Sequence, residues 1–583
     1  MADEDLINKI EETTIDAKRH QQQTLATILH INGRVEYLRQ FLKITNNHFT
    51  VDNFRQLVPL STYDDYADHI NRMAEGISDD DDHDHGRHFL SVDPLLCFFL
   101  SSGTSNMKPK LIPYFDSAAS KAVSFLAHHG SSAIQRRLFP QRPTVNKSLW
   151  FIYAGNVTVT KSGFKAMPAS SVPLSGNKET QSQFLSTCIA PAEVVKGSNL
   201  QQQMYCHLLC GLSKFEIIDS IRAPYAIGLI KAFSLLHTKW EQLCKDLESG
   251  TVTSEITDVA MRDSVNEFLC GPHPEIAQRV SAMCQEKSWD GILAKLWPNA
   301  RFIRCIMTGS MQQYYPKLKH YAGSLQLLGG EYFTSECCVG INMDILQPPE
   351  MTRYVILPTA AYFEFLPFDL DVNNDSIRKE TVALPEVEIG KMYEVVVTTY
   401  RGLYRYRLGD IIKVVGFHNS SPEVEFVMRA PKDLKEVLTE RDLMRAIQNL
   451  ELAVGSLVTE QIIEFSAFMD LESESKLVKI FVEFACGCAL LRQEKKKELI
   501  LLLESCRSTI EDGLGAFYKL KKESSKIKTL VLSIVKSGTF DLLLQKAIEN
   551  GAPASQYKPP KIIRSRKIAD FMDASSALTV TFN

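Results

Sequence analysis

The amino-terminal part of the chain places apolar side chains at helical spacing, as at Leu25, Ile28 and Leu29. Apolar residues that recur three and four positions apart form one face of an amphipathic helix. We therefore expect the first 45 residues of the chain to be helical.

Further along, short apolar runs alternate with longer helical segments. The short runs cover 95–100 and 149–153, and the helical segments cover 194–213 and 222–248. Strands that alternate with helices of this length are typical of α/β proteins. The pattern therefore predicts a mixed α/β fold from Val92 onward.

Between residues 392 and 427 the pattern changes to closely spaced β-strands, separated by glycines and by the turn sequence His-Asn-Ser-Ser-Pro. These features indicate hairpins. A charged stretch follows, after which helices alternate with strands near 478–484 and 529–535. We expect a large N-terminal domain, 1–427, and a small C-terminal domain, 428–583.

Composition and charge narrow the class of protein. At 583 residues the chain exceeds what one hydrophobic core usually supports, and 45% hydrophobic and 23% charged residues are typical of globular proteins. The 65 Lys and Arg against 69 Asp and Glu give a net charge of -4, which is too balanced to attract nucleic acid or an anionic membrane. We expect neither as a partner.

Three features of the sequence point to the cytoplasm. The first residues lack the basic and apolar regions of a secretory signal. The longest apolar runs, 95–100 and 499–503, are far shorter than the roughly 20 residues that span a bilayer. Thirteen cysteines without paired spacing fit reduced thiols. We therefore expect a cytoplasmic protein without a transmembrane helix.

Three clusters of possible metal ligands have simpler explanations. The acidic block 79–85 is typical of a solvated loop. The segment Cys206–Cys210 lies in an apolar helical stretch and is expected in the core. Cys486 and Cys488 lack a second pair of ligands at zinc spacing, so we expect no bound zinc.

The segment Ser101–Ser105 directly follows the apolar run 95–100 and brings hydroxyls and a glycine close to Lys108 and Lys110. Hydroxyl and backbone N–H groups can bind phosphate oxygens, glycine permits close approach, and lysine adds positive charge. The same residues are compatible with an ordinary turn. The chain lacks the Walker, dinucleotide-binding, zinc-protease and serine-hydrolase motifs, so those classes have no sequence support.

Two further segments carry residues suited to a nucleotide. One contains Tyr332, Phe333 and Glu336, and the other is GLYRYRLGD, which ends at Asp410. An aromatic ring can stack on a base, a glutamate can hold Mg²⁺, and an aspartate can accept hydrogen bonds from ribose hydroxyls. Each also has a plainer explanation, as core aromatics, a solvated loop residue and a hairpin turn at Gly409 and Asp410. Their occurrence together, in this order, favours the nucleotide site.

The strings SSGTS, YFTSE and YRLGD resemble the ordered nucleotide motifs of acyl-adenylate-forming enzymes, a superfamily that includes luciferase. Longer strings, among them MTGSM, YCHLLCGL, YFEFLP, KSGTFD and SQYKPPK, resemble the plant acyl-acid amido synthetases. That family conjugates auxins, jasmonate and benzoate-type acids to amino acids. The resemblance implies a large adenylate-forming domain, with β-sheets flanked by helices and a β-barrel-like portion, and a small mobile α/β domain at the C-terminus.

The resemblance also implies ATP and Mg²⁺ as cofactors and roles for individual residues. The residues implied in ATP binding are Ser101, Ser102, Gly103, Thr104, Ser105, Tyr332, Phe333, Ser335 and Asp410. Among them, Tyr332 and Phe333 would lie along the adenine, and Asp410 would hold the ribose. The residues implied in catalysis are Ser102, Thr104, Glu336 and Lys558. Glu336 would reach Mg²⁺, and Lys558 would reach the phosphate when the C-terminal domain closes.

For the acid substrate, the benzoate-type branch implies an arginine on the helix after SSGTS, where this chain has His129. Histidine can still donate a hydrogen bond to the acid's carboxylate, so His129 is the candidate substrate residue, although it lacks the fixed charge and the bidentate fork of arginine. A benzoate-like or isochorismate-like acid joined to glutamate is the first expectation, with jasmonate or indole-3-acetate as alternatives. A ligase that uses coenzyme A as the acceptor and a non-catalytic ligand-binding relative also stay open. We expect a monomer.

The hinge between the two domains departs most from the family pattern. After Val427 the family typically has two arginines, a short apolar strand and a Ser-Asp-Lys segment, whereas this chain reads MRAP from 428 to 431 and continues with Lys432 and Lys435. Pro431 restricts the backbone where rotation would be absorbed. Either one of these lysines contacts the phosphate, or adenylation is impaired; we expect impairment.

Overall fold

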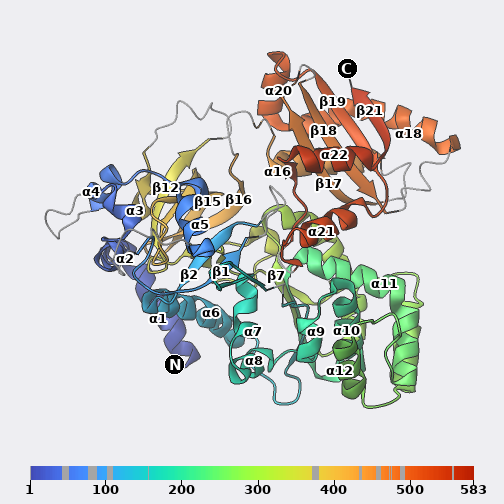
Figure 1. Cartoon of the computed structure of the whole chain (residues 1–583). Helices are drawn as coiled ribbons and strands as arrows, with labels where there is room; N and C mark the ends of the chain where they lie inside the picture. The colour runs from blue at the N-terminus through green and yellow to red at the C-terminus, as the bar shows by residue number, and fades with distance from the viewer. Residues whose placement is uncertain are drawn as a thin grey trace.

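The computed structural model shows an N-terminal part built on three β-sheets and a C-terminal part built on one (Figure 1). The residues that it describes are 2–42, 51–76, 88–101, 109–154, 157–369, 380–431, 436, 438–454, 461–471, 473, 476–485, 493–554 and 557–582. The mixed α/β fold that the sequence predicts is confirmed.

The chain opens with two helices, α1 (Asp3–Ile15) and α2 (Ala17–Asn32). Asp16 separates them and caps α2, because its carboxylate accepts a hydrogen bond from the backbone N–H of Arg19. The side chains that the periodicity placed on one face, Leu25, Ile28 and Leu29, are buried. The expected helical start of the chain is therefore confirmed.

The largest sheet is antiparallel and follows the order β13-β12-β14-β15-β16-β11-β10-β9. Its strands are β9 (Tyr332–Phe333), β10 (Cys338–Ile341), β11 (Tyr354–Ile356), β12 (Tyr362–Phe368), β13 (Val382–Ala383), β14 (Met392–Thr398), β15 (Tyr406–His418) and β16 (Ser421–Arg429). The sheet curls, because side chains from β9 and β15 touch although three strands separate them in the order.

The hairpin turn considered at Gly409 and Asp410 is wrong, because both residues lie inside the long strand β15. The pairing of β15 with β14 shifts register here: Glu394 faces Ile411, but Val396 faces Arg407. Two extra residues of β15 therefore bulge out of the ladder, and Gly409 adopts a positive φ of 70° that suits glycine. A bulge of this kind re-aims the side chain next to it, which is Asp410.

A second sheet is entirely parallel, in the order β3-β6-β7-β8, and helices α10 and α11 pack against it. The elements are β3 (Lys147–Trp150), β6 (Ile218–Tyr225), β7 (Phe302–Ile306), β8 (Gln326–Leu328), α10 (Leu200–Ser213) and α11 (Ala226–Ser249). The helix expected at 222–248 is wrong at its start, because residues 222–225 complete β6. Pro224 has no N–H to give to a helix, so α11 begins only after it.

The helix expected at 194–213 is also interrupted. It consists of α9 (Ala192–Lys196) and α10, separated at Gly197. Asn199 starts the second helix as its cap, because its side-chain oxygen accepts a hydrogen bond of 3.1 Å from the backbone N–H of Gln202. The cluster Cys206–Cys210 lies buried in α10, as predicted.

The third sheet follows the order β2-β1-β5-β4 and contains the strand predicted at 95–100. Its strands are β1 (Leu95–Leu100), β2 (Leu111–Phe115), β4 (Thr158–Val159) and β5 (Lys165–Met167). Helix α6 (Ala118–Leu138) follows β2 and begins at the cap Ser117, whose hydroxyl accepts from Ser120 N–H. The antiparallel pair β1 and β2 thus carries the candidate phosphate loop at its open end.

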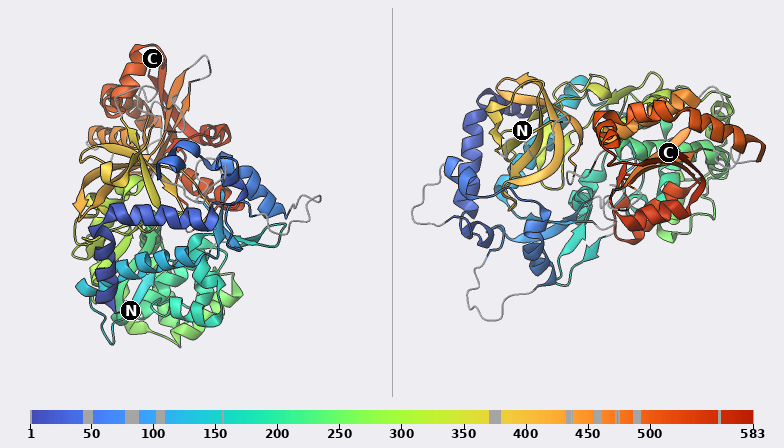
Figure 2. Two further views of the ribbon diagram at one scale, coloured as in Figure 1. Left: turned by 90° about the vertical axis from the view of Figure 1, so that its left-hand side faces the viewer. Right: turned by 90° about the horizontal axis from the view of Figure 1, so that it is seen from above.

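The C-terminal part has a five-stranded sheet in the order β20-β17-β18-β19-β21 (Figure 2). Its elements are α16 (Glu440–Val454), β17 (Ile462–Asp470), β18 (Leu477–Phe484), β19 (Thr529–Val535), α21 (Thr539–Glu549), β20 (Ile562–Ile563), α22 (Arg566–Ala574) and β21 (Ser576–Phe582). The strands predicted at 478–484 and 529–535 are confirmed. Strand β16 continues to Arg429, so the domain boundary expected after 427 falls inside a strand.

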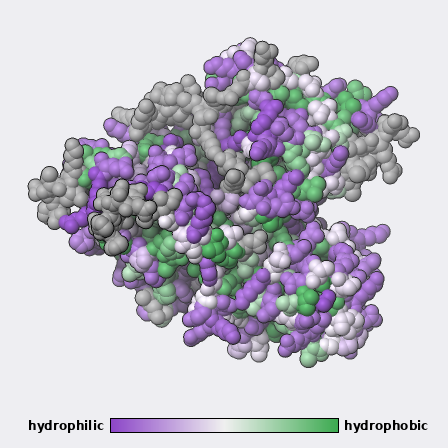
Figure 3. Space-filling model, viewed as in Figure 1, coloured by the Kyte–Doolittle hydropathy of each residue, from purple (hydrophilic) through white to green (hydrophobic). Residues whose placement is uncertain are grey.

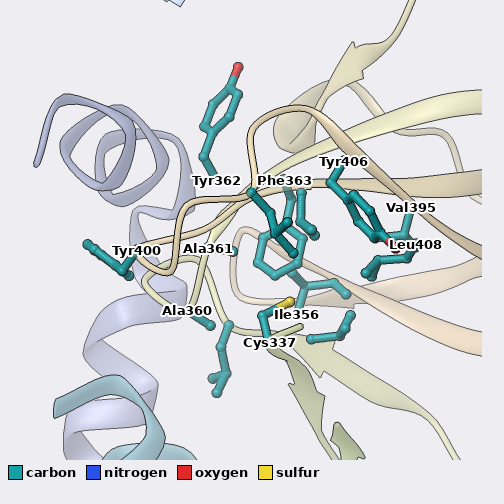
Figure 4. Packing of buried hydrophobic residues seen from close by; sticks show 14 of the residues in the cluster. Cys337, Ile356, Ala360, Ala361, Tyr362, Phe363, Val395, Tyr400, Tyr406 and Leu408 are labelled. Carbon is teal, nitrogen blue, oxygen red and sulfur yellow. The ribbon is translucent and has the colours of Figure 1, made fainter. Parts of the chain in front are cut away.

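Separate hydrophobic cores lie under the eight-stranded sheet, around the parallel sheet and inside the C-terminal part. Figure 4 shows a portion of the first, in which Cys337 of the β9–β10 turn lies near Ile356 of β11 and Phe363 of β12. Because Cys337 is buried there, the core anchors the turn that carries its neighbour Glu336.

The outer surface is mainly polar on the face drawn in Figure 3, where hydrophobic residues form scattered groups. Across the described part of the chain, we find no helix with the length and apolar character that crossing a membrane requires. The same residues contain no group of three or more His, Cys, Asp or Glu side chains placed to hold a metal ion. The acidic block 79–85 and the pair Cys486 and Cys488 lie outside the described residues.

Candidate functional site

Asp410 is the centre of a buried polar cluster that joins three strands. The Tyr332 hydroxyl of β9 donates a hydrogen bond of 2.7 Å to one carboxylate oxygen of Asp410. Arg429, which pairs with Asp410 across β15 and β16, places Nη1 2.6 Å from the other oxygen. Asp410 raises the pKa of Arg429 above its usual range, since opposite charges stabilise each other.

The turn between β9 and β10 presents Ser335 and Glu336 beside this cluster. Thr334 closes the turn, because its hydroxyl accepts from the N–H of Cys337 at 3.1 Å. Burial raises the pKa of Glu336, and the nearby Arg429 opposes that rise. A carboxylate held at the tip of a rigid turn, next to a second carboxylate, can serve as a ligand for a hard cation.

Tyr332 and Phe333 point in different directions, and their expected place along the adenine stays a prediction. Consecutive residues of a strand point to opposite faces. Tyr332 is buried against Tyr354 and Phe426 and turns its hydroxyl to Asp410. Phe333 points to helix α6 instead, where its ring meets His128 with centroids 4.3 Å apart.

The candidate phosphate loop is described only at its base. The Ser101 N–H donates to the carbonyl of Lys110 at 3.0 Å, and the Lys110 N–H donates to the Ser101 hydroxyl at 2.8 Å. These two bonds close the loop. The predicted site residues Ser102, Gly103, Thr104 and Ser105 lie outside the described residues, so their roles stay predictions.

His129 is exposed on α6, and its ring stacks on Phe125 one helical turn away, with centroids 4.1 Å apart. The residues of α6 that line the pocket beside Glu336 lie further towards the start of the helix, at Ser120, Val123 and Ser124. The structure therefore does not bring His129 to that pocket.

The pocket beside Glu336 lies between α6, the β9–β10 turn and the β14–β15 connection. Its other lining residues are Cys337, Cys338, Ala360, Thr399, Tyr400 and Arg401. Arg401 donates hydrogen bonds to the hydroxyls of Ser120 at 2.7 Å and Ser124 at 3.2 Å. Sequence analysis missed this arginine, although it directly precedes the GLYRYRLGD motif.

Lys558 lies at the interface between the two parts of the chain. Its ammonium is 4.0 Å from the centre of the Tyr225 ring, at the end of β6. Burial raises the pKa of Glu440 at the start of α16, while Arg429, Lys561 and Lys558 oppose the rise. Glu440 therefore connects the Lys558 side of the interface electrostatically with the Asp410 cluster. Lys432 and Lys435 of the hinge lie outside the described residues.

A buried polar contact also joins the two parts. Glu464 of β17 forms an ion pair with the fully buried Lys561 and accepts a hydrogen bond from Tyr314 of the N-terminal part. Nearby, an apolar cavity between α11 and α21 is lined by Tyr153, Tyr557 and other residues. The cavity can take an apolar group at the interface.

Comparisons with known proteins cover nearly the whole chain. The GH3 family N-terminal domain matches residues 6–327, the GH3 family central domain 354–429, and the GH3 family C-terminal domain 441–567. The chain is similar to a solved GH3.15 acyl acid amido synthetase, with a TM-score of 0.82 and 30% identity over 99% of this chain and 97% of that one.

Curated relatives have similar names. A probable indole-3-acetic acid-amido synthetase GH3.6 of Oryza sativa subsp. japonica is 47% identical over 65% of this chain and 79% of its own length. A jasmonoyl-L-amino acid synthetase GH3.5 of the same plant is 34% identical over 96% and 94%. An indole-3-acetic acid-amido synthetase GH3.17 of Arabidopsis thaliana is 33% identical over 97% and 94%.

Proposed function

Because the chain belongs to the GH3 family, we propose that it is an acid-amino acid ligase that uses ATP to activate a small carboxylic acid as its acyl-adenylate. The acyl group then passes to an amino acid. The observation that carries this proposal is the meeting of Tyr332 and Glu336 of one segment with Asp410 of another, beside a pocket lined by the cationic side chain of Arg401.

The chemistry explains why such a site needs both donors and acceptors. In the first half-reaction a carboxylate oxygen of the acid bonds to the α-phosphorus of ATP, and pyrophosphate leaves. In the second, the amino nitrogen bonds to the acyl carbon, AMP leaves, and the nitrogen loses its proton. Asp410 would accept from the ribose hydroxyls, since a carboxylate has about four lone-pair sites and Tyr332 and Arg429 take two.

The residues present fit a magnesium ion that arrives with the nucleotide. Mg²⁺ usually binds through one or two carboxylates, substrate phosphates and water. Glu336 supplies one carboxylate, and the described residues offer no cage of three or more protein ligands. When bound, the ion would offset charge on the phosphates.

We propose indole-3-acetate or jasmonate as the acid class, because similar proteins are named for these acids. A benzoate-like acid stays a prediction. We also propose that the C-terminal part, expected from residue 428 but beginning only after β16 ends at Arg429, is a mobile domain that brings Lys558 to the phosphate, supported by its own sheet and core. The protein would act as a cytoplasmic monomer.

The test is acid-dependent exchange of pyrophosphate into ATP, with indole-3-acetic, jasmonic and benzoic acids, followed by mass analysis of products formed with amino acids or coenzyme A. We expect exchange with at least one acid and an amide product. Exchange with a thioester product would instead identify a coenzyme A ligase. No exchange with any acid would favour a non-catalytic ligand-binding relative.

A further inference from the structure

Arg401 is a cation whose hydrogen bonds and ring contacts are all to neutral side chains, although Glu336 lines the same pocket. It follows β14 and reaches across to helix α6, where its guanidinium donates to Ser120 and Ser124. Its remaining close neighbours are aromatic: the guanidinium carbon is 4.4 Å from the Tyr114 ring centre and 5.9 Å from that of Phe99. Burial lowers the pKa of Arg401, so its charge is incompletely compensated.

Two other partly buried arginines of the same domain have carboxylate partners, whereas Arg222, like Arg401, has only a serine hydroxyl and an aromatic ring. Arg304 pairs with Glu331 at 2.5 Å, and Arg405 pairs with Glu364 at 2.9 Å. Among the described residues, no carboxylate lies within ion-pair distance of Arg401. A buried charge without a partner is costly, and an anion that binds in the pocket beside Arg401 would offset this cost.

The position of Arg401 defines what that partner can be. The side chain lines the pocket beside Glu336, together with small and apolar groups such as Val123 and Ala360. Two of the five guanidinium N–H donors are used by the serines, which fix the plane and leave the others free. A guanidinium that is held in one plane and has free N–H donors can form two parallel hydrogen bonds to the two oxygens of a carboxylate.

We infer that Arg401 binds the carboxylate of the acid substrate, in the pocket formed by α6 and the β9–β10 turn. Ser120 and Ser124 are positioning residues, because they act through Arg401. The inference rests on the proposed ligase function. It assigns recognition of the acid's carboxylate to an arginine on the β14–β15 connection. The acid is thereby held beside Glu336, where activation would occur.

The test measures equilibrium binding to the full-length chain by calorimetry. The probes are three acids and their neutral amides: indole-3-acetic acid with indole-3-acetamide, jasmonic acid with its amide, and benzoic acid with benzamide. We expect the wild type to prefer an acid over its amide. Arg401→Gln should weaken binding of the acid by about 10- to 100-fold. It should change the Kd of the amide and of ATP by less than about twofold. Arg401→Lys, which keeps the charge, should recover part of the loss.

Two variants on α6 serve as comparisons. Arg137→Gln removes an exposed arginine far from the pocket and should leave the binding of acid, amide and ATP unchanged. His129→Ala should also leave the preference unchanged. The inference is overturned if Arg401→Gln keeps the preference, if it weakens acid and amide equally, or if the wild type prefers no acid over its amide. Pyrophosphate exchange by the wild type is scored separately, so loss of the proposed function is distinguishable from failure of the Arg401 assignment.

Discussion

The two carboxylate oxygens of Asp410 already contact Tyr332 and Arg429, and a ribose would have to share these oxygens with them. Tyr332 donates to one oxygen, and Arg429, whose side chain is 52% exposed, contacts the other. The exposed arginine can move aside more easily than the buried tyrosine. We therefore expect nucleotide binding to displace Arg429 and keep the Tyr332 bond, which holds the carboxylate in place.

Asp410→Ala should weaken ATP binding by about 10-fold or more, because each lost charge-assisted hydrogen bond contributes about 1.5 to 3 kcal/mol. Tyr332→Phe should have a smaller effect, since the carboxylate stays. Calorimetric titration with ATP measures both. Circular dichroism confirms that the variants are folded. A folded Asp410→Ala protein with wild-type affinity would remove Asp410 from the nucleotide site.

His207 predicts a pH dependence of stability. It is fully buried in α10, and burial lowers its pKa from 6.5 to about 4. The unfolded chain therefore binds a proton between pH 6.5 and 4 that the folded chain does not, and stability falls as the pH drops through this window. The loss is at most about 3 kcal/mol.

His207→Gln should flatten the fall in melting temperature between pH 6.5 and 4.5, because glutamine does not titrate and can still donate to the Ile152 carbonyl that His207 contacts at 3.3 Å. Scanning calorimetry at several pH values measures the change. His30→Gln, on the exposed face of α2, is the control. Parallel curves for wild type and His207→Gln would mean that His207 does not titrate in this way.

At the residue scale, sequence shows which chemistry is present but not which groups meet. Tyr332, Glu336 and Asp410 could be predicted, because their types and order together suit a nucleotide, and the structure does bring them together. Their binding roles stay predictions. Arg401 could not be found, because a single arginine before a glycine has no distinguishing pattern. Only the folded structure shows that Arg401 contacts helix α6.

At the scale of elements, the strands 95–100, 478–484 and 529–535 were predictable because short apolar runs end there at polar or turn residues. The start of the segment 222–248 was predicted wrongly, although Pro224, which disfavours helical backbone at the residue before it, is a sequence signal that the helix begins later. In the folded protein these first residues are extended, because they belong to β6, which pairs with β3 and β7 in the parallel sheet.

The contact between Tyr314, Glu464 and Lys561 should stabilise the docking of the two parts of the chain. Tyr314→Phe removes one charge-assisted hydrogen bond across the interface and should cost about 1.5 to 3 kcal/mol of docking free energy. Glu464→Gln leaves the fully buried Lys561 without its counter-charge and should cost about 3 to 5 kcal/mol of stability.

Urea unfolding and limited proteolysis measure these two losses. The control is Lys231→Ala, which removes an exposed 2.8 Å ion pair between α11 and α21 and should cost less than about 1 kcal/mol. If Tyr314→Phe changes protease sensitivity no more than Lys231→Ala does, the buried contact does not govern docking.

At the scale of the whole molecule, the proposed function requires the C-terminal part to move, because Lys558 would have to reach the phosphate. Lys558 is held here mainly over the face of Tyr225, an interaction of about 0.5 to 2 kcal/mol that a bound phosphate could outcompete. The polar contact at Glu464 must also break or slide. We therefore propose that this arrangement is one of at least two states, with a hinge that follows the end of β16 at Arg429.

The hinge sequence decides the last prediction. Pro431 restricts the backbone where the proposed rotation would be absorbed, and the lysine expected at the phosphate has no counterpart other than Lys432 or Lys435. Adenylation would need that cation most, because negative charge gathers at the α-phosphate in this step.

We expect supplied acyl-AMP and amino acid to form amide faster than acid, ATP and amino acid do, as measured by product mass over time. Lys435→Ala should slow only the complete reaction, Lys558→Ala should slow it further, and the exposed Lys526→Ala should change neither. Equal rates from both starting points, unaffected by Lys432→Ala and Lys435→Ala, would show that the altered hinge has no catalytic consequence.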